Sequence, residues 1–206
     1  MRWIQIVALS IAVGLSLAPE AAGQAAREGV NPPAPPAPAS KLSPKEQRSE
    51  LLDRLFGRLQ TAKSEAEAKV AEQAIWGLWS HSGSPTDDIL LEQAIKAMNV
   101  RHYSEALQIL DALVEHAPNF AEAWNKRATV NYITGKLDRS LSDIDKVLEL
   151  EPRHFGALSG LGMIRRDRGD ERGALEAFRD ALAINPHMSS VRDAVKLLEK
   201  DLEQKI

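Results

Sequence analysis

The sequence contains no cysteine. This absence excludes disulfides, thiolate metal sites, a cysteine nucleophile and lipid attachment through a cysteine. An excess of positive charge is also missing, because 26 Lys and Arg stand against 29 Asp and Glu, for a net charge of -3. That balance argues against a nucleic-acid partner and against electrostatic binding to anionic lipid. The 206 residues have room for one or two domains.

Catalytic and metal-binding patterns are absent from the sequence as well. None of the five histidines has a second histidine three or four residues later, and neither H-E-x-x-H nor G-x-S-x-G occurs. Asp143 and Asp145 lie two positions apart, so on a helix they point to different faces. The sequence therefore predicts a protein that is not an enzyme and that uses no metal, cofactor or small-molecule substrate.

Residues 1–25 have the layout of a secretory signal peptide. Arg2 precedes an apolar run from Trp3 to Ala18, and Pro19 and several small residues follow. Small residues at the -3 and -1 positions favour cleavage after Gly23 or after Ala25. An uncleaved anchor is the alternative, but about 16 helical residues span roughly 24 Å, less than the ~30 Å hydrocarbon core. We expect export without stable membrane insertion after cleavage, and a periplasmic location in a Gram-negative cell.

Residues 26–43 contain repeated prolines among alanines and serines, which predicts an extended or disordered linker. Residues 44–86 then show two apolar stripes at helical spacing, one from Leu51 to Leu59 and one from Ala68 to Trp79. They predict a helical hairpin that caps the N-terminal end of the remaining chain. Trp76 and Trp79 lie three residues apart on its second helix, which favours core packing over an exposed interaction patch.

The remaining chain repeats with a period of 34 residues. The period relates Pro118, Pro152 and Pro186, and it also relates Ala94, Ala128 and Gly162. Five such sets keep one register, including leucines at 107, 141 and 175. The repeats span residues 87–120, 121–154 and 155–188, and an amphipathic segment at 189–206 predicts a C-terminal capping helix.

A helix-turn-helix unit of this length resembles the tetratricopeptide repeat family. The resemblance depends on small, aromatic, glycine and proline residues at fixed repeat positions: Trp124, Ala128, Gly135, Pro152, Gly162, Gly169 and Pro186. The first repeat is less regular, because Arg101 stands where the turn glycine usually lies. The expected fold is all-α, a right-handed solenoid of stacked hairpins.

The resemblance implies that the first helix of each repeat lines a concave groove that binds a peptide or protein segment. The groove residues it implies are Leu91, Ile95, Met98, Asn125, Lys126, Thr129, Tyr132, Met163 and Arg166. The alternatives are that these residues merely solvate a scaffold, or that they hold the protein's own C-terminal helix. Arg127 stands where the family has leucine, so we expect it to pair with a carboxylate such as Glu92, or alternatively to contact a ligand anion.

The function implied is a non-catalytic protein-interaction scaffold, similar to periplasmic tetratricopeptide proteins of the bacterial envelope. The alternative is a regulatory or adaptor subunit that lends its groove to an envelope enzyme.

Overall fold

The computed structural model describes residues 42–204, which form helices and no strand. The predicted signal segment, and the predicted linker as far as Lys41, lie outside the described residues. The helices are α1 (Pro44–Thr61), α2 (Glu65–Trp79), α3 (Pro85–Asn99), α4 (Tyr103–His116), α5 (Ala121–Ile133), α6 (Leu137–Leu150), α7 (Phe155–Asp167), α8 (Glu171–Ile184) and α9 (Ser189–Glu203). Within this range no helix is long and apolar enough to cross a membrane.

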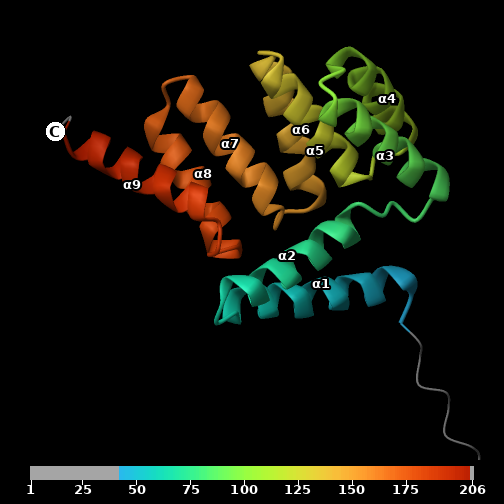
Figure 1. Cartoon of the computed structure of the whole chain (residues 1–206), viewed down its shortest axis with the longest axis horizontal. Coiled ribbons are helices and arrows are strands. Elements are labelled where there is room, and N and C mark those ends of the chain that lie inside the picture. Colours follow the sequence, from blue (N-terminus) through green and yellow to red (C-terminus); the bar gives the residue numbers. More distant parts are fainter. Residues whose placement is uncertain (1–41, 205–206) are drawn as a thin grey trace, which may run out of the picture. The chain divides into compact units, whose positions relative to one another are not determined.

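Three hairpins form the repeat array. The hairpins α3–α4, α5–α6 and α7–α8 coincide with the three repeats, and each second helix packs on the first helix of the next hairpin (Figure 1). Helix α9 packs on α8 at the C-terminal end. The all-α solenoid is therefore confirmed, since no hairpin alone could bury its apolar face and neighbouring hairpins must stack.

Small residues allow the two helices of a repeat to approach closely. The Ser140 hydroxyl on α6 donates a hydrogen bond to the backbone carbonyl of Ala128 on α5, at 2.8 Å. In the next repeat, a Cβ atom added to Gly162 would lie 2.5 Å from the ring of Phe178. A larger side chain at either position would force the paired helices apart.

The turns inside the three repeats share one backbone conformation. Gly135 and Gly169 have φ angles of 75° and 79°, in the left-handed region that glycine tolerates without steric cost. Arg101 occupies the equivalent place in the first repeat and has a φ of 62°. The departure from glycine thus leaves the turn intact, and the arginine backbone takes a conformation that costs an L-residue roughly 1–2 kcal/mol.

The N-terminal hairpin α1–α2 begins at a capping box, in which Ser43 and Glu46 satisfy each other's backbone N–H groups. Its buried face includes Phe56, Ile75 and Trp79, and Phe155 from the start of α7 joins the same apolar cluster. Trp76 packs against that cluster, with its ring centroid 5.4 Å from that of Phe155. The expected core packing of Trp76 and Trp79 is confirmed.

The position of this hairpin differs from the expected N-terminal cap. Its partners are the loop between α6 and α7 and the last turn of α8: Arg153 pairs with Asp53 at 2.6 Å, and Gln60 donates to the carbonyl of Ala183 at 3.3 Å. The reason is chemical, because the two tryptophans need a large apolar and aromatic surface, and Phe155 with the ring of His154 supplies it.

Candidate functional site

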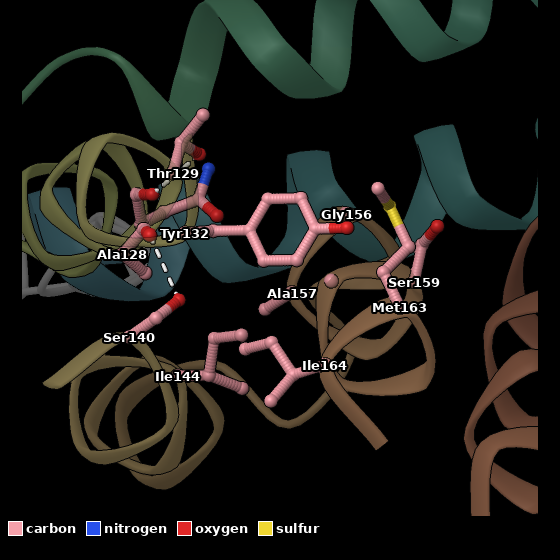
Figure 2. Close-up of a pocket in the computed structure, with 12 residues that line it drawn as sticks. Ala128, Thr129, Tyr132, Ser140, Ile144, Gly156, Ala157, Ser159, Met163 and Ile164 are labelled. Carbon is pink, nitrogen blue, oxygen red and sulfur yellow. Dashed lines mark hydrogen bonds between the residues drawn. The ribbon is translucent and has the colours of Figure 1, made fainter. Parts of the chain in front are cut away.

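A cavity of about 180 Å³ lies between α5, α6 and α7. Figure 2 shows Ile144 and Ile164 facing each other on one side of it, with the ring of Tyr132 reaching across another. The walls combine small, apolar and uncharged polar residues: Asn125, Ala128, Thr129, Tyr132, Ser140, Ile144, Gly156, Ala157, Ser159, Gly160, Met163 and Ile164. Thr129 is exposed, and Tyr132, Ser159 and Met163 are partly exposed, so the cavity opens to solvent on their side.

Hydrogen bonds hold the polar residues at the mouth of this cavity. The Tyr132 hydroxyl donates to Asp167 at 2.6 Å, which links α5 to α7. The same bond, together with partial burial and the negative charge of Asp167, raises the pKa of the Tyr132 phenol. The Thr129 hydroxyl donates to the backbone carbonyl of Asn125 at 2.9 Å. The mouth is therefore organised before any partner arrives.

Beside the cavity lies a fully buried carboxylate, Glu122, with three side-chain partners. Lys126 approaches it at 2.7 Å, His154 at 3.1 Å, and Asn125 donates to it at 3.0 Å. Burial by itself raises the pKa of Glu122, but the hydrogen bond to His154 and the charge of Lys126 outweigh it, so the pKa lies below its ordinary value. The carboxylate is ionised and compensated inside the protein.

His154 has a defined tautomer because of its two contacts. Its Nδ1 accepts the backbone N–H of Ala157 at 3.0 Å and caps the start of α7, so Nε2 carries the proton donated to Glu122. The indole ring of Trp79 stacks on the imidazole, with ring centroids 4.1 Å apart. This buried arrangement fixes the α1–α2 hairpin against the second and third repeats.

Helix α2 contacts one residue of the cavity wall. A Cβ atom on Gly156, a cavity residue, would lie 2.6 Å from the ring of Trp76. The ammonium of Lys126 lies 5.3 Å from the centre of that ring, within the range of a cation–π contact. Trp76 therefore packs closely against Gly156, and periodicity along α2 cannot reveal this contact because it joins distant segments.

Four of the residues expected in the groove line the cavity: Asn125, Thr129, Tyr132 and Met163. Lys126 lies beside it, held by Glu122. Arg166 is exposed on α7, with its guanidinium 3.6 Å from Asp167.

The first repeat contributes less than expected. Leu91 is 2% exposed and packs in the core of that repeat, so its assignment to the groove is corrected. Its position faces inward because α3 packs on α4 and α5, and Leu91 belongs to the apolar core that these helices share. Ile95 and Met98 pack partly against the same core and keep some exposure.

Arg127 is paired with carboxylates, as expected, but not with Glu92. Its guanidinium makes two hydrogen bonds to Asp143, at 2.6 and 3.0 Å, and one to Asp111 at 3.0 Å. Glu92 instead pairs with Lys96 one turn along α3. The arginine at this position is explained by these bonds between helices, and no ligand anion is needed to account for it.

Sequence analysis missed the glycines of the cavity. Gly156 and Gly160 lie one helical turn apart on α7, and a Cβ on Gly160 would lie 3.2 Å from Ile144. The two glycines were a visible signal, since glycine is unfavourable inside a helix and both lie within α7. Across residues 42–204 no group of three or more His, Asp or Glu side chains is placed to hold a metal ion.

Comparison with known proteins agrees with this geometry. A family model described as "Tetratricopeptide repeat" matches residues 91–145 and 134–189. A TPR repeat-containing protein of Rhizobium etli is 37% identical over 151 residues, which are 73% of this chain and 74% of that protein. The chain belongs to the tetratricopeptide repeat family.

Solved structures of tetratricopeptide repeat (TPR) domains share the fold. The Sgt2 TPR domain from Aspergillus fumigatus has a TM-score of 0.55 at 22% identity, over 59% of this chain and 82% of that chain. The first TPR of Spaghetti (RPAP3), solved with a bound HSP90 peptide, has a TM-score of 0.55 at 18% identity, over 57% of this chain and 93% of that chain. TPR domains of this family generally mediate protein–protein interactions.

Proposed function

We propose that this protein is a non-catalytic interaction module that binds a peptide or protein segment in the groove beside Tyr132. The observation that carries the proposal is the open cavity between α5, α6 and α7, walled by apolar residues and bordered by uncharged polar ones. Concave sites with an apolar floor and a few oriented polar groups are where proteins bind ligands. A related fold binds a peptide in the RPAP3 structure, which supports a similar use here.

Tyr132 is the residue we expect to contribute most to binding. It is central in the array, its ring borders the cavity, and its hydroxyl is held by Asp167. Binding hot spots are enriched in aromatic residues near the centre of an interface. An aromatic ring held in place before binding also loses little conformational entropy when a partner arrives.

The test begins with capture of the partner on the purified protein, followed by titration of that partner against variants. We expect Tyr132→Ala to weaken binding by about fivefold or more, which corresponds to ~1 kcal/mol. Glu176→Ala is the matched control, because Glu176 is exposed on α8. If Glu176→Ala weakens binding and Tyr132→Ala does not, the groove is not the site.

We further propose that the protein acts in the periplasm or cell envelope. The support is the apolar segment and small residues of positions 1–25. Mass spectrometry of the exported protein should find a new N-terminus at Gln24 or Ala26. A full-length chain retained in the membrane would contradict this location. The identity of the captured partner also tests the role, since an envelope enzyme would indicate an adaptor subunit and a structural protein a scaffold.

A further inference from the structure

The cavity beside Tyr132 has the size of one amino-acid side chain. Its volume is about 180 Å³, and an engineered protein cavity of about 150 Å³ holds a benzene molecule. A side chain with four to seven heavy atoms therefore fits. The apolar residues Ala128, Ile144, Ala157 and Ile164 line its interior, where they are themselves almost fully buried.

The chemistry of the walls selects against a charged side chain. None of the residues that line the cavity is charged. Charged groups beside it already have partners, since Glu122 has Lys126 and His154, and Asp167 has the Tyr132 hydroxyl and the Arg166 guanidinium. A carboxylate or ammonium that entered would lose hydration with no opposite charge to compensate it. Burial of a leucine-sized side chain in such a place is favourable, because it removes apolar surface from water.

The route into the cavity is also restricted. Thr129 is exposed, and Tyr132, Ser159 and Met163 are partly exposed, so a segment enters from their side. The methionine on that side is flexible and adapts to the shape of an apolar guest.

We propose that this cavity is a specificity pocket that accepts one uncharged side chain of leucine or methionine size from an extended partner segment. The proposal rests on the groove function proposed above and adds the chemical class of residue that the groove selects. The uncharged walls identify the occupant, because they favour burial of an apolar side chain and make burial of a Lys, Arg, Asp or Glu side chain unfavourable.

The test uses small probes on the full chain, so it does not require the natural partner. The probes are the N-acetyl methylamides of leucine, methionine, lysine and glutamate, titrated to millimolar concentration into the ¹⁵N-labelled protein. We expect the leucine and methionine probes to shift the amide signals of Thr129, Tyr132, Ser159 and Gly160. The lysine and glutamate probes should need at least tenfold higher concentration for half-saturation. Equal concentrations for all four, or shifts confined to other residues, would overturn the pocket.

Variants at the mouth of the cavity test whether the leucine probe binds in the cavity itself. Ser159→Phe places a ring over the cavity and should raise the half-saturation concentration of the leucine probe at least tenfold. Ser104→Phe is the matched control, because Ser104 is exposed on α4, and it should leave the titration unchanged. If Ser159→Phe does not fold, Thr129→Trp blocks the mouth from α5, where Thr129 is exposed. Unchanged leucine binding in the folded blocking variant would show that the cavity is not the pocket.

Failure here is distinguishable from failure of the groove function. If Tyr132→Ala weakens the captured partner while the four probes do not differ, the groove binds but the cavity does not select an apolar residue. If the leucine probe binds selectively while Tyr132→Ala leaves the partner unaffected, the proposed groove function is wrong.

Discussion

At the scale of single residues, buried charge is where this protein depends most on geometry. Glu122 and His154 are both fully buried, and each needs the other to satisfy its hydrogen-bonding groups. His154 additionally caps α7 and stacks on Trp79. One imidazole thus stabilises a carboxylate, a helix start and an interface between segments far apart in the chain.

We expect His154→Ala to lower the free energy of unfolding by about 3 kcal/mol, because Glu122 loses a hydrogen bond inside the protein and α7 loses its cap. Urea denaturation followed by circular dichroism measures the change. His102→Ala is the control, since His102 is exposed and makes no capping bond at the start of α4. It should change stability by less than about 0.5 kcal/mol. Similar effects of both substitutions would contradict the buried network.

The positive φ angle of Arg101 suggests a substitution that should stabilise the protein. Because its φ of 62° is unfavourable for arginine and natural for glycine, Arg101→Gly should raise the unfolding free energy by about 1 kcal/mol. Arg101→Ala removes the same side chain without relieving the backbone and should give no comparable gain. The measurement is thermal or urea unfolding of the three proteins. A gain for alanine equal to that for glycine would show that the side chain, and not φ, is responsible.

At the scale of secondary-structure elements, stability depends on how closely the two helices of each repeat approach. Ala128 is almost fully buried on α5, and its carbonyl receives the Ser140 hydroxyl from α6. The corresponding approach in the next repeat leaves no space for a side chain, because a Cβ atom on Gly162 of α7 would lie 2.5 Å from the ring of Phe178 on α8.

Gly162→Leu should therefore overpack the α7–α8 contact and cost on the order of 1–3 kcal/mol. Ala74→Leu is a matched control on α2, where Ala74 is exposed, and it should be close to neutral. Equilibrium denaturation of both variants is the measurement. Wild-type stability of Gly162→Leu would contradict the repeat register on which the architecture depends.

At the scale of the whole molecule, the α1–α2 hairpin lies against the α6–α7 loop and the end of α8. Removing the hairpin should therefore affect these segments rather than α3. A fragment of residues 85–206 should expose Phe155 and leave His154 without Trp79. Hydrogen exchange should then accelerate at the start of α7, around residues 155–158, and the melting temperature should fall. An N-terminal cap would instead protect α3. Faster exchange confined to α3 would therefore contradict the observed packing.

Much of this architecture was predictable because a repeat leaves its period in the sequence. The 34-residue spacing of Pro118, Pro152 and Pro186 indicated three hairpins, and Gly135 and Gly169 lie in the turns that need a positive φ. These features are local, since helix ends, turns and close helix pairs depend on residues within one repeat. Part of the groove was predictable for the same reason, which is why Tyr132 and Met163 were found.

The sequence by itself determined the helical class, the repeat register and the small residues between paired helices, because each depends on short-range periodicity. Tertiary structure decided which residues of distant segments contact each other. It placed Trp76 and Trp79 against Gly156 and His154, made Asp143 and Asp111 the partners of Arg127, and buried Leu91. These contacts join residues from different helices, and the pattern along one helix carries no information about which surface will cover it. The cavity likewise exists only where α5, α6 and α7 meet.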